Sequence, residues 1–141
     1  MAFVSVTRLR VRSLRFIPSF AVHTLRSRQQ VRKALGFVTG ALLTDRNMTF
    51  WTMTVWDSQE SMRAFMTSGA HKRVMPYLLN WCDEASVVHF TQPDETLPSW
   101  AEADAHMREN GRASKVLHPS PQHATLNYRA PRITAGALIR R

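Results

Sequence analysis

The spacing of hydrophobic and polar residues changes several times along the chain, and each change marks an expected element. Residues 3–11 alternate in character with a period of two, which is typical of a β-strand. The same stretch is rich in Arg and Ser and lacks acids, as a transit peptide does, but the alternation favours the strand. Residues 13–35 have apolar positions near helical spacing, with Pro18 where the regular helix begins and Gly36 where it ends.

Two further strands are expected at residues 37–44 and 47–56, joined by a short hairpin loop. The second strand is rich in Thr, Val and aromatic residues, which favour a pleated surface. Alternation divides its side chains between two faces, with Phe50, Thr52, Thr54 and Trp56 on one and Trp51, Met53 and Val55 on the other. Both sets are largely apolar, which indicates a strand that is covered on both faces.

The next part of the chain predicts two helices and a fourth strand. Asp57 and Glu60 form a capping-box pattern that begins the first helix. The second helix is expected to kink or restart at Pro76, because proline does not fit deep inside a helix. Residues 87–91 then have the composition of a strand.

The predicted order is therefore strand, helix, strand, strand, helix, strand. This order indicates an α+β, ferredoxin-like βαββαβ fold, in which one antiparallel sheet has helices on one side. The other face of the sheet would then be apolar and open to water, which a monomer should avoid. We therefore expect a homodimer that packs these two faces together as a dimeric α+β barrel.

The last third of the chain differs in character. Residues 93–98 are a linker, and Ser99 with Glu102 forms a second capping box that begins an extra C-terminal helix, which Gly111 ends. The residues after it contain three prolines, no acid and no clear period, so we expect an extended or disordered basic arm whose deletion from residue 124 onward leaves stability nearly unchanged. These breaks divide the chain into a barrel domain at 1–92, a linker and accessory helix at 93–111, and a tail at 112–141.

Composition limits the class of protein. The 141 residues are 44% hydrophobic, which is enough for one domain with a substantial core. The single cysteine, Cys82, permits no internal disulfide and is expected to be a buried thiol, which suits a reducing, cytoplasmic setting. No apolar run approaches the roughly 18 residues that would predict a membrane span.

The net charge of +9 is unevenly distributed. Residues 1–44 carry eight Lys or Arg and no acid, and residues 111–141 carry six and no acid. The central block at 45–110 has five basic and ten acidic residues. Binding of nucleic acid through the basic ends is the weaker interpretation, because no recognition motif accompanies the charge, and a solubilising role is favoured.

Several motifs resemble one protein family. The run from Phe50 to Phe90 contains W-x-x-x-x-W-D and S-G-A-H, and it is followed by S-W-A-E-A and G-R-x-S-K-V-x-H-P-S-P. These motifs resemble the DUF3291 family of small bacterial proteins, over about residues 3–123. The resemblance implies the dimeric α+β barrel superfamily and a relation to spheroidene monooxygenase and, more distantly, to antibiotic-biosynthesis monooxygenases. That superfamily includes cofactor-free oxygenases, haem enzymes and non-enzymatic members.

Three histidines are candidate catalytic residues. His71 follows a Gly-containing turn at a helix start, where its imidazole could act as a general acid or base, or hydrogen-bond the backbone. His89 lies in the fourth strand, where it enters a pocket if its face lines one and is otherwise a core histidine. His23, on the first helix, could approach the edge of a cavity. The remaining histidines, His106, His118 and His123, are expected at the surface or on the arm.

Large apolar side chains are the candidate ligand-binding residues, namely Trp51, Met53, Trp56 and Trp81. For any single tryptophan an ordinary core role is the favoured interpretation, but three tryptophans this close in sequence are consistent with a flat apolar ligand. The sequence has no metal-ligand spacing, no phosphate-binding Gly loop and no serine nucleophile elbow. These observations argue against a hydrolase, a kinase or a nicotinamide enzyme.

The resemblance, together with these features, implies a monooxygenase-like enzyme that acts on a small aromatic or polyene molecule in an enclosed pocket. In a cofactor-free enzyme, a histidine would take a proton from an electron-rich substrate that itself reacts with oxygen. In a haem enzyme, which the resemblance to spheroidene monooxygenase implies, His71 would be the metal ligand. The alternative is a non-catalytic protein that binds a small ligand on the same scaffold.

Overall fold

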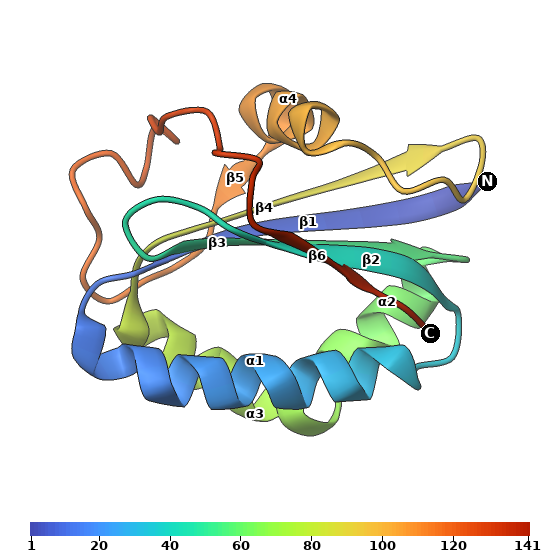
Figure 1. Ribbon diagram of the computed structural model, residues 1–141, viewed down its shortest axis with the longest axis horizontal. Coiled ribbons are helices and arrows are strands. Elements are labelled where there is room, and N and C mark those ends of the chain that lie inside the picture. The colour runs from blue at the N-terminus through green and yellow to red at the C-terminus, as the bar shows by residue number, and fades with distance from the viewer.

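One antiparallel sheet of six strands organises the chain, in the order β5-β4-β1-β3-β2-β6 (Figure 1). The computed structural model describes residues 1–141. The strands are β1 (Ala2–Val11), β2 (Phe37–Thr44), β3 (Thr49–Trp56), β4 (Cys82–Gln92), β5 (Arg112–Ala113) and β6 (Gly136–Ile139). The helices are a short 3-10 turn (Leu14–Phe16), α1 (Ile17–Arg32), α2 (Gln59–Met66), α3 (Gly69–Trp81) and α4 (Trp100–Asn110). This order confirms the predicted α+β, ferredoxin-like fold.

The central strand β1 confirms the prediction of a strand at residues 3–11. It pairs with β3 on one side and with β4 on the other, so that Ser5 lies opposite both Thr54 and His89. Its side chains alternate between the two faces of the sheet. Ser5 and Thr7 point toward the layer formed by α1, α2 and α3, whereas Val4 points toward α4.

The helix boundaries mostly follow the local signals, with one corrected cap. Pro18 lies in the first turn of α1, and the capping box of Ser99 and Glu102 begins α4, as predicted. The N-cap of α2 is Ser58 rather than Asp57, because the Asp57 backbone N–H still bonds the Gly36 carbonyl at 2.9 Å and so continues the strand pairing.

The second half of the ferredoxin-like unit is more regular than the sequence predicted. Helix α3 continues through Pro76 as one helix. Strand β4 begins at Cys82, directly after α3 and five residues earlier than expected, because it pairs along almost the whole length of β1. Cys82 is fully buried, as predicted, and burial raises the pKa of its thiol to about 12.

The expectation of an apolar sheet face open to water is wrong. Helix α4 lies on the side of the sheet opposite α1 and α3 (Figure 1), and its Ala103 and Met107 pack on that face. The strand residues below them are at most 3% exposed, and they include Val4, Val6, Trp51, Met53, Val55 and Val88. The need to cover this face therefore gives no reason for a homodimer, because the same chain already covers it.

The tail is irregular, as expected, but it is not detached from the sheet. It contributes β5 next to β4 and β6 next to β2. Ile139 of β6 is 2% exposed, and the guanidinium groups of Arg28 and Arg32 on α1 donate to the carbonyls of Leu138 and Arg140. Among all of the helices, none has the length and apolar character that crossing a membrane requires.

Candidate functional site

A cavity of about 360 Å³ lies between the sheet and the layer formed by α1, α2 and α3. Its volume is at the lower end of the range of roughly 300–1,000 Å³ that small-molecule sites occupy. The strands contribute Ser5, Thr7, Leu9, Phe50, Thr52, Thr54, Trp56, Val87 and His89 to its floor. The helices contribute a mostly apolar roof that includes Phe20, His23, Val31, Met62, Phe65, His71, Val74 and Leu78.

The strand register gives this floor a polar centre. Thr54 on β3, Ser5 on β1 and His89 on β4 lie in one row across three neighbouring strands. Side chains at such directly opposed positions have Cβ atoms about 4.5–5.5 Å apart. Trp56 lies beyond one side of this row, and Phe50 lies at the other end of the floor. A ligand on the floor would therefore meet polar side chains in the middle and aromatic rings at both ends.

His71 lies at the start of α3 and presents a defined ring nitrogen. Its Nδ1 lies 3.2 Å from the Met66 carbonyl oxygen, which can only accept, so the bonded Nδ1 carries the proton. In the neutral ring, Nε2 therefore holds the lone pair. Burial lowers the pKa of His71 below its ordinary value, and the bond to Met66 offsets only part of this effect. The imidazole is consequently neutral near pH 7 and able to accept a proton or to ligate a metal.

His89 faces the cavity from β4, beside the ring of Phe3 at a centroid distance of 5.3 Å. Its Nε2 is buried and has no hydrogen-bond partner within the protein. Burial lowers the pKa of His89, and the positive charges of Arg112 and Arg63 lower it further. This imidazole is therefore also neutral near pH 7.

His23 is the third histidine around the cavity. Its ring lies against Trp81 and Tyr77, at centroid distances of 5.5 and 6.2 Å. The structure thus brings all three predicted histidines to the same cavity, from α1, α3 and β4. Their roles in catalysis stay a prediction.

Only one of the four predicted apolar ligand-binding side chains is well placed. Trp56 lines the cavity, and its buried indole Nε1 has no partner. Trp51 borders the cavity through its strand position, but its indole packs on the α4 side and donates to Asp45 Oδ2 at 3.2 Å. Met53 packs on the α4 side as well, so its assignment to the pocket of His71 is wrong. Strand alternation is the reason, since only even-numbered residues of β3 point to the cavity.

Trp81 lies outside the cavity lining. It ends α3, where its ring packs on Tyr77 and His23 and belongs to a buried cluster with Val11 and Phe20. Its predicted role in ligand contact is therefore corrected to support of His23. The last turn of α3 places this side chain against Tyr77 and His23, which spacing along the sequence could not reveal.

Sequence analysis missed the polar floor and one basic residue. The hydroxyl groups of Ser5 and Thr54 were interpreted only as strand-favouring side chains, although alternation already placed Thr54 on the same face as Trp56. Arg28 on α1 also lines the cavity, and its Nε is buried without a partner. No local signal distinguishes this arginine from the other arginines of α1.

A haem cofactor, which the family resemblance implied, can be tested against His71. Histidines that ligate metals usually donate their other ring N–H to a carbonyl or carboxylate, and His71 donates Nδ1–H to Met66 in this way. His71 therefore fits the role of iron ligand, and bound haem would supply the oxidation chemistry. The chain has no group of three or more His, Cys, Asp or Glu side chains placed to hold a metal ion.

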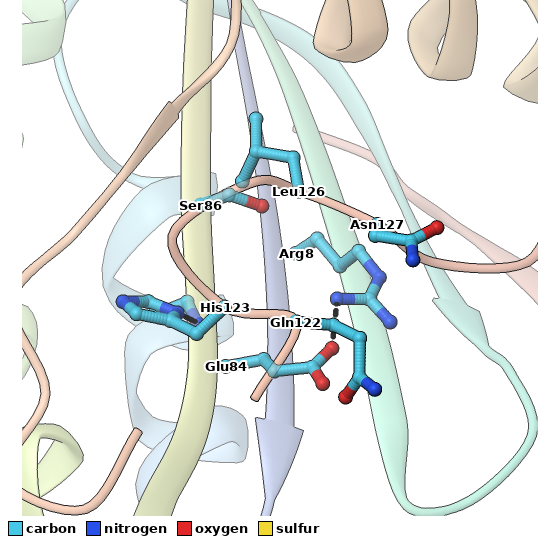
Figure 2. Close-up of a pocket in the computed structure, with 8 residues that line it drawn as sticks. Arg8, Glu84, Ser86, Gln122, His123, Leu126 and Asn127 are labelled. Carbon is cyan, nitrogen blue, oxygen red and sulfur yellow. Dashed lines mark hydrogen bonds and ion pairs between the residues drawn. The ribbon is translucent and has the colours of Figure 1, made fainter. Parts of the chain in front are cut away.

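A second polar cluster lies on the other face of the sheet, beneath the tail (Figure 2). Arg8 Nη1 donates to Glu84 Oε1 at 2.7 Å, and the Ser120 hydroxyl donates to Glu84 Oε2 at 2.7 Å. Burial alone would raise the pKa of Glu84, but these bonds and the charges of Arg8 and Arg10 lower it overall. The cluster encloses essentially no free volume, so it fastens the tail to the sheet rather than binding a ligand.

His123 belongs to this cluster and lies on the arm, as expected, but it is buried there rather than at the surface. It is 9% exposed, and its Nδ1 accepts from the Ala85 backbone N–H at 3.3 Å. Its Nε2 lies 2.8 Å from the Ser114 carbonyl oxygen and therefore donates to it. One imidazole thus bonds both β4 and the tail, and no sequence motif indicated this role.

Comparison with solved structures identifies proteins of the same fold. SnoaB, a cofactor-independent oxygenase from Streptomyces nogalater, superposes with a TM-score of 0.55 and 20% identity, covering 70% of this chain and 98% of that one. Rv0793 from Mycobacterium tuberculosis gives 0.61 and 10%, covering 69% and 100%. An antibiotic biosynthesis monooxygenase gives 0.58 and 12%, covering 67% and 100%. About a third of this chain therefore has no counterpart in these shorter proteins.

Comparison at the level of sequence identifies the family. No curated protein matches the chain. The family described as "Domain of unknown function (DUF3291)" matches residues 21–118, which include all three histidines of the cavity and most of its floor and roof. The match extends over more than half of the sequence. The chain therefore belongs to the DUF3291 family and has the α+β fold of the antibiotic biosynthesis monooxygenases.

Proposed function

We propose that this protein is a cofactor-free, monooxygenase-like enzyme that acts on a small, electron-rich aromatic or polyene molecule bound in the cavity. The observation that carries the proposal is His71, a neutral imidazole with an available Nε2 at the wall of a largely apolar cavity. A base of this kind is most effective where water is excluded and the ring is uncharged. The fold of SnoaB, a cofactor-independent oxygenase, supports the same reaction class.

In the proposed reaction, Nε2 of His71 takes a proton from an activated CH₂ group of the substrate. The resulting carbanion donates electrons to O₂, and a C–O bond forms between the substrate carbon and oxygen. Loss of water from the peroxide then leaves a carbonyl, so that one oxygen atom enters the product and the other leaves as water. The unpartnered N–H of Trp56 is a suitable donor to the oxygen atom on which negative charge develops.

Anthrone tests this proposal, because deprotonation of its CH₂ group gives an electron-rich anion that can be oxidised to anthraquinone. We expect protein-dependent oxygen uptake in an oxygen electrode, together with anthraquinone measured by its absorbance. Binding of anthrone without oxygen uptake would favour the non-catalytic alternative. An absorption band that appears on addition of haemin and disappears in H71A would favour the haem alternative.

A homodimer is the assembly that the α+β barrel resemblance implies, and we retain it as a proposal. The face beneath α4 is already buried within one chain, so two chains would have to associate through another surface. Sedimentation equilibrium at micromolar concentration tests this directly. A mass of one chain across the concentration range would exclude the dimer.

A further inference from the structure

The charged residues around the cavity all have the same sign. Three permanently basic side chains line it, namely Arg28, Arg112 and Lys115, and no Asp or Glu does. The chain as a whole has ten acidic residues, so acids are available but are placed elsewhere. A cavity that is apolar inside and basic at its edges suits a ligand with an apolar body and a negative charge.

Arg112 and Lys115 mark one edge of the cavity. Arg112 on β5 lies opposite Val87 of β4, and Val87 points into the cavity, so Arg112 shares that face. His89 is two residues further along β4, which makes it the diagonal neighbour of Arg112, at roughly 7–8 Å. Neither Arg112 nor Lys115 forms an ion pair, because the ion pairs of the chain are made by Arg8, Arg10 and Arg108.

Arg28 marks the opposite edge, where β6 covers the side of the cavity. Its Nη2 donates to the Leu138 carbonyl at 3.1 Å, which fixes the guanidinium beside the strand. Its Nε is buried without a partner. A buried donor next to free volume is unusual in folded proteins, and a ligand oxygen would satisfy it.

We propose that the ligand of this cavity is an apolar carboxylate, whose anionic group lies between Arg112 and Lys115 at the β5 edge while its apolar body lies on the floor. The neutral His89 would then contribute a hydrogen bond rather than a competing charge. This inference rests on the proposed function, since it names the substrate class for the same cavity. It differs from the proposed function because it requires a negative charge on the substrate, whereas the proposed oxidation does not.

Two probes of nearly equal shape test the inference. 9-Anthracenecarboxylate carries the anionic group, and 9-anthracenemethanol is its neutral counterpart. Fluorescence anisotropy of each probe is titrated with the full chain at low salt. We expect the carboxylate to bind about tenfold more tightly, because each partly exposed cation contributes up to about fivefold. The preference should shrink at 0.5 M salt, an ionic strength chosen to screen these charges.

Matched variants locate the source of the preference. R112Q and K115Q together should reduce the preference for the carboxylate to about twofold or less, with the affinity for the neutral probe unchanged. R129Q is the control, since Arg129 is exposed, lies on the tail and does not line the cavity. It should leave the preference unchanged. All three positions are exposed, so the variants should melt at the temperature of the unmodified protein.

The outcomes separate this inference from the proposed function. Equal affinity for the two probes would overturn the anionic ligand and leave an apolar substrate intact. The anionic ligand would also be overturned if R129Q weakened the preference for the carboxylate as much as R112Q and K115Q do, because the effect would then depend on net charge alone. Failure of both probes to bind would overturn the anionic ligand together with the cavity as the site of the proposed reaction.

Discussion

The two faces of the sheet are formed by the same strands, yet their side chains differ in packing and in polarity. On the side of α4, strand residues such as Val4 and Met53 are at most 1% exposed and belong to one buried apolar cluster, and Arg8 is paired with Glu84. On the side of α1, α2 and α3, the floor holds hydroxyl groups and His89 beneath a cavity of about 360 Å³. Trp56 Nε1 and His89 Nε2 have no partner within the protein and belong to residues that line this volume, whereas the unpartnered Arg8 Nε and Ser86 Oγ of the other face belong to a cluster that encloses essentially none.

This difference indicates a division of roles between the two faces. Close packing and paired charges stabilise a fold, and a substitution there is expected to act on stability. Buried donors beside an open volume do not contribute to stability in the same way, and a substitution there should act on ligands or on catalysis. Each substitution below changes one face and uses a position on the other face, or far from both, as the control.

The largest effect is expected from H71A, which removes the proposed base from the cavity side. With anthrone as substrate, the rate of oxygen uptake should fall by about 10²–10⁴-fold, the contribution typical of general base catalysis. The control is H118A, because His118 is exposed on the tail and does not line the cavity. Equal rates for H71A and the unmodified protein, both folded by circular dichroism, would remove His71 from the mechanism.

On the packed face, M53A should act on stability alone. Met53 is 1% exposed, so its truncation leaves a cavity and should lower the free energy of unfolding by about 2–5 kcal/mol. The adjacent residue Thr52 points to the cavity side, and T52A should cost less than about 1 kcal/mol. Urea unfolding monitored by tryptophan fluorescence measures both. If T52A proved as costly as M53A, the proposed division between the faces would be incorrect.

A smaller effect on stability is expected at the end of the tail. Ile139 points to the cavity side and is 2% exposed, whereas its neighbour Leu138 is 50% exposed. I139A should lower the free energy of unfolding by about 2 kcal/mol, near the lower limit for such truncations because β6 lies at the sheet edge. L138A should change it by less than about 0.5 kcal/mol. Thermal melts of the two variants compare them directly.

The same contacts bear on the expected neutrality of deleting the tail. A deletion from residue 124 onward would remove Ile139 and also Tyr128, whose hydroxyl donates to Asp104 at 2.6 Å and whose ring packs on Trp51. We therefore expect this deletion to destabilise the protein, contrary to the expectation from sequence. A melting temperature unchanged by the deletion would show that these contacts contribute little.

The smallest effect concerns pH and again distinguishes the cavity histidines. The folded-state pKa values of His71 and His89 lie below the ordinary value of 6.5, because burial disfavours the charged rings. The unfolded chain then binds protons more readily, so their contribution to stability is complete above about pH 6.5 and is lost as the pH falls below it. H89Q should reduce this loss, and H118Q should not. Urea unfolding at pH 7.5 and 5.5 provides the comparison.

Local sequence patterns determined most of the elements of this fold. Period-two alternation located β1, and it separated Trp56 from Met53 on β3, a strand that its Thr, Val and aromatic content had indicated. Pro18 and Ser99 marked helix starts, because their preferences depend on the backbone of a single turn. These signals depend only on neighbouring residues, so they can be recognised in the amino-acid sequence alone.

The tertiary structure alone decided which face became the site. His23, His71 and His89 lie on three different elements, and only the packing of α1 and α3 on the sheet brings them to one cavity. Helix α4 and the tail likewise cover the other face, through contacts such as that of Ala103 with the sheet and that of His123 with β4. Contacts between residues far apart in the chain depend on how whole elements pack, and no local period or cap encodes that arrangement.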